Sequence, residues 1–471
     1  MITFSHIAFK NTTAIAMREI LIIGIGKSTP ALIKYLVKNA VKEQLNITLA
    51  DKDLAQAKKF LSHDRIKTRV LDVFEKASRE QAIAQADIVV SMLPARFHIE
   101  VAKTCLALGK NLVTASYVSK EMQGLDEEAR SKNLIFMNEC GLDPGIDHMS
   151  AMQVINRIRE AGGEVILFES FCGGLVAPES DNNLWNYKFT WNPRNVVLAG
   201  QGGAAEFIQE GTYKYIPYHR LFRRTEFLDV EEYGRFEAYA NRNSLHYRSI
   251  YGLDDVLTLY RGTMRRVGFS KAWNVFVQLG MTDDSYTLQD TETMSYREFT
   301  NLFLPYSPTD SVELKLRHNL KVDQDDLLWD KLLELDIFNS GKKIALAQAT
   351  PAQCLQKILE DKWTLQPDDK DMIVMYHKFG YTLNGEKKQI DATMVCVGEN
   401  QVDTAMAKTV GLPLAMATLA ILNDEITTPG VQIPIAKEVY APILKQLEQE
   451  GIIFKEYEVP YMGYNPNNVA G

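Results

Sequence analysis

The segment Glu19–Thr29 (EILIIGIGKST) joins a short apolar run directly to Gly24-Ile25-Gly26, and it decides the fold of the amino-terminal part of the chain. It predicts a strand that ends in a tight turn, where a glycine takes a positive φ and helix-start N–H groups can bind a pyrophosphate. The usual third glycine is absent, because Thr29 and Pro30 stand where helix and strand would pack most closely. The motif alone is a weak indication of a dinucleotide site.

Short β-rich runs alternate with helical stretches after this turn, at lengths that suit right-handed crossovers. The further strands expected are 46–50 (NITLA), 68–73 (TRVLDV), 87–92 (DIVVSM), 111–115 (NLVTA) and 134–137 (LIFM). The sequence therefore predicts an α/β fold in which residues 17–143 form a Rossmann-type parallel sheet domain that binds a dinucleotide.

Polar and turn residues follow each of these strands. Ligands of parallel sheets bind at the carboxyl ends of the strands. We therefore expect Asp51, Asp72, Leu93-Pro94, Ser116-Tyr117 and Leu142-Asp143 to converge on one crevice.

Asp51 follows the second strand at about the distance at which an acidic residue binds the adenosine ribose hydroxyls. A carboxylate there repels a 2′-phosphate and favours NAD, whereas the adjacent Lys52 could bind that phosphate as a point charge. The sequence thus favours NAD and leaves NADP open. As an alternative, Asp51 caps the helix expected in the following residues, up to Phe60.

Length and composition limit the class of function. A chain of 471 residues with a net charge of −8 is long enough for two or three domains and unsuited to a nucleic-acid surface. The five cysteines lack CxxC spacing and the eight histidines form no ligand-spaced pair, so we expect reduced thiols and no metal site. These features favour a cytoplasmic enzyme whose partners are small molecules.

No segment has the pattern of a membrane span, because the longest apolar stretch, 409–422, is short and contains a proline. We expect it to form a buried helix. Residues 1–16 fit neither a signal peptide nor a transit peptide, and we expect a disordered leader there, with Met17 as a candidate start.

The sequence pattern changes after Asp143, where proline and glycine form a turn before a helix. Strand-like runs follow at 165–174 (VILFESFCGG), 187–191 (YKFTW), 196–200 (VVLAG), 371–379 and 389–397. We expect residues 144–424 to form a mixed α/β substrate domain with a helical insertion at about 285–365. The segment at about 425–460 is expected to pack back on the nucleotide-binding domain.

Seven motifs suggest a known family: 116–119 (SYVS), 137–148 (MNECGLDPGIDH), 171–179 (FCGGLVAPE), 181–191 (DNNLWNYKFTW), 239–244 (YANRNS), 261–263 (RGT) and 375–379 (MYHKF). With them the chain resembles the saccharopine reductases, the L-glutamate-forming saccharopine dehydrogenases, from Glu19 to about Lys455. The resemblance implies a homodimer held together by the mixed α/β domain. It also implies NAD(P)H reduction of the imine between glutamate and L-2-aminoadipate 6-semialdehyde to saccharopine, and the reverse oxidative cleavage. The glycine turn and Asp51-Lys52 depart from the family pattern, which leaves the coenzyme preference open.

A tricarboxylate such as saccharopine needs cationic or N–H donors, and planar guanidinium groups bind carboxylates bidentately. Arg242 and Arg261 are therefore the candidate carboxylate ligands, with a surface or interdomain salt bridge as the alternative role of each. The resemblance implies that Arg242 binds one substrate carboxylate, while Gly262 and Thr263 offer a backbone amide and a hydroxyl to another.

The catalytic candidates are Tyr117 and Asp143. Ser116 and Tyr117 follow the fifth strand, where Tyr117 would hydrogen-bond the substrate and limit water, and Asp143 would orient the amine or move a proton. The alternatives are a core aromatic role for Tyr117 and a helix cap for Asp143. The full set of coenzyme candidates is Gly24, Ile25, Gly26, Lys27, Ser28, Asp51, Lys52, Asp72, Val73, Leu93, Ala115, Ser116, Leu142, Asp143, Pro144 and Asn192.

Three further residues are expected to be structural. Asp147 and His148 are adjacent on a helix and point in different directions, His98 is expected to make local hydrogen bonds, and Cys172 is expected to be a packing thiol. Two other functions stay open: an imine reductase that makes carboxyspermidine-type polyamines, which would need acidic residues in place of the arginines, and a non-catalytic NAD(P) sensor.

Overall fold

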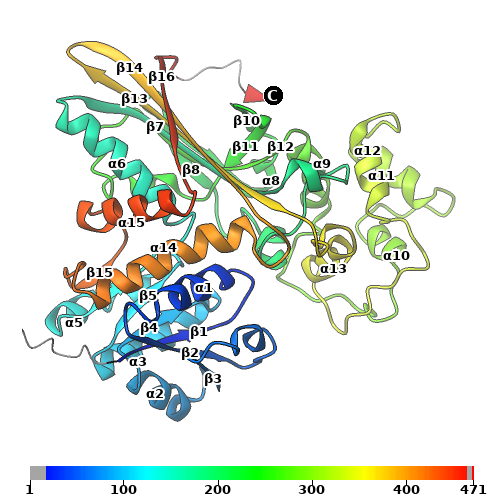
Figure 1. Ribbon diagram of the computed structural model, residues 1–471. Helices are drawn as coiled ribbons and strands as arrows, with labels where there is room; N and C mark the ends of the chain where they lie inside the picture. Colours follow the sequence, from blue (N-terminus) through cyan, green and yellow to red (C-terminus); the bar gives the residue numbers. More distant parts are fainter. Residues whose placement is uncertain (1–16, 464–468, 471) are drawn as a thin grey trace, which may run out of the picture. The chain divides into compact units, whose positions relative to one another are not determined.

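The computed structural model describes residues 17–463, 469 and 470, and the chain divides into two compact units (Figure 1). The first unit contains residues 17–26, Leu32–Asn138 and Ala417–Gln432, and the second contains Lys27–Ala31, Glu139–Met416 and the residues from Ile433 onward. The expected boundary after Asp143 therefore lies five residues earlier, between Asn138 and Glu139. The leader expected at 1–16 lies outside the described residues.

The first unit is built on a seven-stranded parallel sheet with the order β15-β6-β5-β4-β1-β2-β3. Its strands are β1 (Arg18–Ile23), β2 (Leu45–Asp51), β3 (Ile66–Val70), β4 (Ile88–Ser91), β5 (Asn111–Thr114), β6 (Ile135–Met137) and β15 (Gly430–Gln432). The strand order reverses between β1 and β4, which is the point where open α/β sheets bind ligands. The Rossmann-type sheet expected from the sequence is confirmed.

Crossover helices connect these strands: α1 (Pro30–Asn39), α2 (Lys76–Ala84), α3 (His98–Leu108), α4 (Lys120–Gln123) and α5 (Asp126–Ser131). Pro30 occupies the first position of α1, where a missing N–H costs nothing. Between β2 and β3 only a short 3₁₀ turn forms, at Ala57–Phe60. Asp51 therefore does not cap a helix, and that alternative is wrong.

The second unit contains a ten-stranded mixed sheet. Its strands are β7 (Glu164–Val176), β8 (Ala205–Gln209), β9 (Thr212–Ile216), β10 (Thr225–Val230), β11 (Gly234–Ala240), β12 (Thr258–Arg266), β13 (Asp371–Leu383), β14 (Glu386–Val397), β16 (Lys455–Pro460) and β17 (Val469–Ala470). The order is β16-β14-β13-β7-β12-β11-β10-β17, with the β8–β9 hairpin attached to β12. Only the β7–β12 pair is parallel, and the other pairs are antiparallel.

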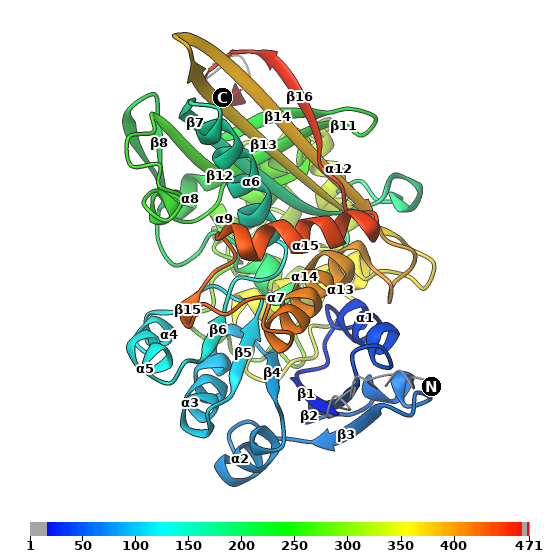
Figure 2. The same ribbon diagram turned by 60° about the vertical axis from the view of Figure 1, so that its left-hand side comes forward.

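The helices of the second unit form two groups. In Figure 2, α6 (Ile146–Glu160) and α15 (Lys437–Gln449) lie side by side on one face of the sheet. The others are α7 (Pro193–Val197), α8 (Tyr218–Leu221), α9 (Phe269–Leu279), α10 (Tyr296–Asn301), α11 (Val312–Leu320), α12 (Leu327–Glu334) and α13 (Pro351–Trp363). The last four make up the expected helical insertion, and they share an aromatic core with α9 that includes Trp273, Trp329 and Trp363.

Three local expectations for the second unit are wrong. Residues 196–200 belong to the end of α7 and the loop after it, because Asn192 caps the helix and Pro193 opens it. Residues 187–191 form no strand beyond one bridge of Phe189 to Thr364. Of the segment 425–460, only β15 joins the sheet of the first unit, since β16 extends the sheet of the second unit beside β14.

The apolar stretch at 409–422 lies within α14 (Ala405–Leu422). Among the described residues, α14 is the helix that is long and apolar enough to cross a membrane, and 83% of it is buried inside the protein. The expectation of a buried helix is confirmed.

Candidate active site

The glycine turn of the first unit has the geometry that a pyrophosphate site needs. Gly24 has a φ of 94°, and a Cβ there would stand 2.8 Å from the carbonyl oxygen of Met92, so no larger residue fits. At Gly26, in contrast, a Cβ would meet nothing within 4 Å. A side chain at Gly26 would therefore occupy space that no protein atom fills.

Asp51 supports this turn directly. Its Oδ2 accepts a hydrogen bond from the N–H of Ile25 at 2.7 Å, and its Oδ1 accepts one from the N–H of Asp53 at 3.2 Å. Lys52 points to Asp72, with 2.9 Å between Nζ and Oδ2, and this lysine side chain is 65% exposed. The Lys52 ammonium and the Phe74 N–H hold the pKa of Asp72 below its usual value. The three residues expected at the ends of β2 and β3 are thus brought together.

A second polar group lies at the ends of β4 and β5. His98 bridges Ser91 and Ser116 by hydrogen bonds of 2.8 and 2.7 Å, and the neighbouring Tyr117 is 37% exposed. A core aromatic role for Tyr117 is therefore wrong, because that side chain is not enclosed.

The remaining coenzyme candidates fall into two sets. Lys27, Ser28, Val73, Leu93 and Ala115 lie in the turns that follow the strands of the first sheet, and the carbonyl of Val73 accepts a hydrogen bond from Arg79. Leu142, Asp143, Pro144 and Asn192 lie outside that sheet in the second unit, to which Lys27 and Ser28 of the glycine turn also belong. Asn192 accepts a hydrogen bond from the Arg194 N–H as the cap of α7, which is a structural role.

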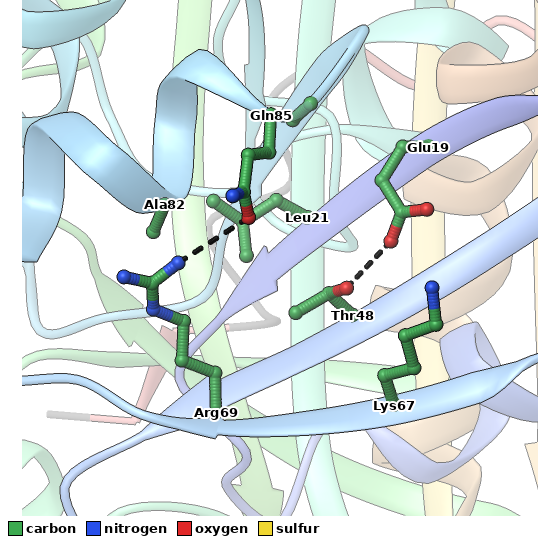
Figure 3. Close-up of a pocket in the computed structure, with 8 residues that line it drawn as sticks. Glu19, Leu21, Thr48, Lys67, Arg69, Ala82 and Gln85 are labelled. Carbon is green, nitrogen blue, oxygen red and sulfur yellow. Dashed lines mark hydrogen bonds between the residues drawn. The ribbon is translucent and has the colours of Figure 1, made fainter.

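A groove of about 330 Å³ lies elsewhere on the first unit (Figure 3). Two pairs of its polar side chains are hydrogen-bonded within the groove: the Thr48 hydroxyl donates to Glu19 at 2.5 Å, and Arg69 donates to Gln85 at 3.4 Å. None of the coenzyme candidates lines it. This groove is therefore not the expected nucleotide site.

The second unit contains a buried ionic cluster around Arg261. Its Nη2 lies 2.6 Å from Oδ1 of Asp143 and 2.6 Å from Oδ2 of Asp147, and the guanidinium stands 4.5 Å from the ring centroid of Tyr247. A guanidinium so close to two carboxylates favours their ionised forms. Asp147 is almost completely buried, whereas the side chain of Asp143 is 16% exposed. Asp143 is the member of this pair that a ligand can reach.

Aromatic and polar residues next to the cluster form a hydrogen-bonded network. His148 lies 2.8 Å from Oε2 of Glu139 through Nε2 and 2.5 Å from the Tyr251 hydroxyl through Nδ1. The Tyr247 hydroxyl also donates to Glu139, at 3.0 Å. The hydrogen bonds of Asp147 and His148 go to different partners, but His148 Nδ1 also lies 3.6 Å from Oδ2 of Asp147, so the two side chains are not as separate as the helical spacing predicts.

The electrostatics of this cluster follow from burial and pairing. Burial alone would raise the pKa of Asp147, but the charges of His148 and Arg261 and the Gly145 N–H lower it below its usual value. Burial raises the pKa of the Tyr251 hydroxyl, and it lowers the pKa of His377 to about 4. His377, which lies 2.8 Å from the Ser150 hydroxyl, is therefore neutral at pH 7.

The arginines expected to bind substrate differ from each other. Arg242 is exposed, has a φ of 49°, and its carbonyl accepts a hydrogen bond from the Glu206 N–H. Arg261 makes buried salt bridges within its own unit, which are neither of the two kinds, surface or interdomain, considered as its alternative role. Gly262 is required by packing, because a Cβ would stand 2.7 Å from the Phe171 ring. Thr263 is half-buried beside Cys172 of β7.

Arg265 is a candidate that the sequence reasoning missed. It is 4% exposed, its Nη1 donates to the Met264 carbonyl at 2.8 Å, and its Nε has no hydrogen-bond partner. The rings of Tyr187 and Phe269 lie 4.9 and 5.3 Å from it, and no carboxylate of residues 17–463 lies within salt-bridge distance. A buried cation without a counter-ion is costly, so this guanidinium fits an incoming anion.

Arg261, Thr263 and Arg265 alternate along β12 and therefore share one face of the sheet. Cys172 is the register partner of Thr263 on β7, and burial together with Asp143 and Asp147 raises the pKa of its thiol, so that it is not a thiolate. This face offers a cationic group, a hydroxyl and the carboxylate of Asp143. It can bind a ligand that carries both carboxylates and an amine.

The comparisons with known proteins agree with this geometry. Residues 20–137 match the family model of the saccharopine dehydrogenase NADP binding domain, and residues 141–452 match that of the saccharopine dehydrogenase C-terminal domain. The chain is similar to saccharopine dehydrogenase [NADP(+), L-glutamate-forming] of Schizosaccharomyces pombe, with 32% identity over 93% of this chain and 99% of that protein. It is also similar to mitochondrial alpha-aminoadipic semialdehyde synthase of Rattus norvegicus, with 32% identity over 93% of this chain and 47% of that protein.

A solved structure shows the same fold. Apo saccharopine dehydrogenase (L-Glu forming) from Saccharomyces cerevisiae superposes with a TM-score of 0.84 at 30% identity, covering 94% of this chain and all of that one. The two family models together cover most of the sequence, and the resemblance inferred from the motifs is confirmed. The chain therefore belongs to the saccharopine dehydrogenase family.

Proposed function

We propose that this protein is the L-glutamate-forming saccharopine dehydrogenase of lysine and aminoadipate metabolism. It interconverts saccharopine, NAD(P)⁺ and water with L-glutamate, L-2-aminoadipate 6-semialdehyde and NAD(P)H. When bound, the coenzyme accepts or supplies the hydride at the carbon of the CH–NH group. The protein binds the carboxylates, orients the amine and controls water and protons.

One observation carries this proposal: Arg265, which is buried and has no carboxylate of residues 17–463 within salt-bridge distance, lies on the same face of β12 as Arg261, the partner of the Asp143 carboxylate. Saccharopine carries three carboxylates and one secondary amine. Arg265 and the exposed Arg242 suit two of the carboxylates, with the Thr263 hydroxyl as a further donor. Asp143, which lies 2.6 Å from the Arg261 guanidinium, suits the amine in its protonated form.

Tyr117 and Asp143 remain the candidates for direct roles in the reaction. Asp143 would hold the ammonium of saccharopine and accept its proton as the imine forms and hydrolyses. Tyr117, which is partly exposed beside Ser116, would hydrogen-bond the substrate and limit the access of water. Arg261 acts through Asp143 and is a positioning residue.

We propose NADP as the preferred coenzyme, although Asp51 alone favours NAD. Both oxygens of Asp51 accept backbone N–H groups, so this carboxylate has a structural use in the glycine turn. Lys52 is exposed, and its ion pair with Asp72 is of the weak surface kind that a phosphate can replace. The NADP(+)-named relatives support this choice.

The test is to mix purified protein with saccharopine and NADP⁺ and to follow absorbance at the wavelength of the reduced coenzyme. We expect turnover with saccharopine, formation of glutamate, and a higher kcat/KM with NADP⁺ than with NAD⁺. A protein that binds the coenzyme but leaves saccharopine unchanged would disprove the substrate assignment. A higher kcat/KM with NAD⁺ would disprove only the coenzyme assignment.

We also propose a homodimer located in the cytoplasm. The resemblance supports the dimer, and the acidic composition, with a net charge of −8, suits that compartment. Light scattering of the purified protein measures the mass in solution, and a mass equal to that of one chain would contradict the dimer. Cell fractionation tests the location.

A further inference from the structure

One imidazole connects the ends of two neighbouring strands in the first unit. His98 opens α3 and is 4% exposed. Its Nδ1 lies 2.8 Å from Oγ of Ser91, the last residue of β4, and its Nε2 lies 2.7 Å from Oγ of Ser116. Ser116 follows β5 by two residues. The ring therefore bridges the carboxyl ends of β4 and β5.

This arrangement does not suit acid–base chemistry. No carboxylate lies within salt-bridge distance of His98 in the part of the chain that the structure describes, and burial lowers its pKa to about 4. The ring is therefore neutral at pH 7, with one nitrogen donating a hydrogen bond and the other accepting one. Two serine hydroxyls at 2.7 and 2.8 Å complete this pattern, and the Thr114 hydroxyl lies a further 3.5 and 3.4 Å from Nδ1 and Nε2, so the imidazole has no capacity left for a substrate.

The bridge fixes the direction of the Ser116 hydroxyl. Ser91 is fully buried and cannot turn to water, so it holds one side of the ring. The other side then holds Ser116, which is only half-buried. Thr114 adds a constraint, because its hydroxyl oxygen accepts the N–H of Ser116 at 3.3 Å. Both the backbone and the side chain of Ser116 are thus set before a ligand arrives.

We propose that His98 is a positioning residue for the coenzyme, which holds the Ser116 hydroxyl toward the nicotinamide half of bound NADP(H). The ends of β4 and β5 lie next to the β1/β4 reversal of strand order, whereas the glycine turn and Asp51 lie at β1 and β2. The two halves of a dinucleotide bind on the two sides of such a reversal. The inference rests on the proposed function in one respect, which is that the protein binds NADP(H).

The test is a double-mutant cycle of His98→Phe and Ser116→Ala, with NADPH affinity measured by fluorescence titration. Each single variant should weaken NADPH binding about three- to tenfold, the range for one neutral hydrogen bond. The double variant should bind no more weakly than the weaker single variant, because His98 acts through Ser116. The affinity for 2′,5′-ADP, which lacks the nicotinamide half, should stay unchanged.

Two further variants separate positioning from stability. His98→Gln keeps one donor and one acceptor, should recover part of the affinity, and replaces His98→Phe in the cycle if that variant does not fold. Thr104→Val is the matched control on the same helix, because Thr104 is also buried and makes hydrogen bonds to Arg79 and Glu100. It should lower the melting temperature and leave NADPH affinity unchanged.

Two results would overturn the proposal: additive losses in the double variant, or an equal loss of affinity for 2′,5′-ADP. Either would show that His98 supports the whole unit and not one hydroxyl. These results do not depend on the substrate. If the wild-type protein binds NADPH but does not oxidise saccharopine, the proposed function fails and the titration still decides the role of His98.

Discussion

At the scale of single residues, Arg265 is the sharpest test of substrate binding. Arg265→Met should raise the KM for saccharopine about 10- to 100-fold, because a charge-assisted hydrogen bond to a carboxylate contributes about 1.5–3 kcal/mol. The KM for the coenzyme should stay the same. The free energy of unfolding should not fall, since the substitution removes a buried cation that has no counter-ion. Steady-state kinetics and urea unfolding measure these effects.

The neighbouring arginine provides the control for this substitution. Arg266 lies on the opposite face of β12, where its Nη1 donates to the Tyr233 carbonyl and its guanidinium stands over the Phe236 ring. Arg266→Met should leave both KM values unchanged. Equal changes in saccharopine KM for the two variants would show that the loss comes from strand stability and not from a lost carboxylate ligand.

Asp147 tests the buried cluster by its effect on stability. Asp147→Asn should cost about 3–5 kcal/mol at pH 7, because it leaves Arg261 with one buried partner fewer. The folded pKa of Asp147 lies below its unfolded value of 3.8, so this stabilisation is complete above pH 4 and is lost as the pH falls further. The difference in unfolding free energy between wild type and Asp147→Asn, measured by urea unfolding, should be smaller at pH 3.5 than at pH 7. A gap that stays constant would contradict the ion pair as its source.

The sequence predicts some site residues well because their roles are local. Gly24 and Asp51 are set by a turn and the next strand, and their geometry follows from spacing within one βαβ unit. The roles of Arg261 and Arg265 depend on residues far away in the sequence, such as Asp143 and Tyr187. Spacing in Arg261-Gly262-Thr263-Met264-Arg265 does place both arginines on one strand face, and that signal could have identified Arg265.

At the scale of elements, the glycine turn makes a paired prediction. Gly24→Ala should destabilise the first unit, because its Cβ would collide with the Met92 carbonyl at a φ of 94°. Gly26→Ala should leave the melting temperature nearly unchanged, because its Cβ meets no protein atom. It should nevertheless weaken coenzyme binding about tenfold or more, since the methyl group takes space that a pyrophosphate needs. Calorimetry and NADPH titration measure both; normal affinity in Gly26→Ala would place the pyrophosphate elsewhere.

The errors at this scale have a common cause. Residues 196–200 contain a short apolar run that suits a strand or a helix equally, and the Asn192-Pro193 cap signal decides for the helix. The segment 425–460 contains two short strands, and nothing local shows that β15 and β16 join different sheets. Six of the seven strands of the first sheet were predictable, because strands and crossover helices alternate in a repeating pattern along the sequence.

At the scale of the whole molecule, buried ionisable groups make stability depend on pH in opposite directions. Burial raises the pKa of Glu226 to about 8 and that of Asp371 to about 6, so these carboxyls oppose folding as the pH rises. Burial lowers the pKa of His98 and His377 to about 4, so these imidazoles oppose folding as the pH falls. Each unit contains one such histidine. On the acid side, the loss of stability should therefore come from protonation of the buried histidines and not only from protonation of ordinary carboxylates.

The acid side of that range can be measured through His377. An unfolded histidine binds a proton below about pH 6.5, while the folded His377 does so only near pH 4, so stability is complete above 6.5 and is lost between 6.5 and 4. The loss amounts to about 3 kcal/mol at pH 4. His377→Gln, which cannot titrate, should show a smaller loss of unfolding free energy between pH 7 and pH 4.5 than the wild type. His219→Gln, at an exposed position, is the control and should follow the wild-type curve. Identical pH curves for His377→Gln and the wild type would show that this imidazole is not buried in its neutral form.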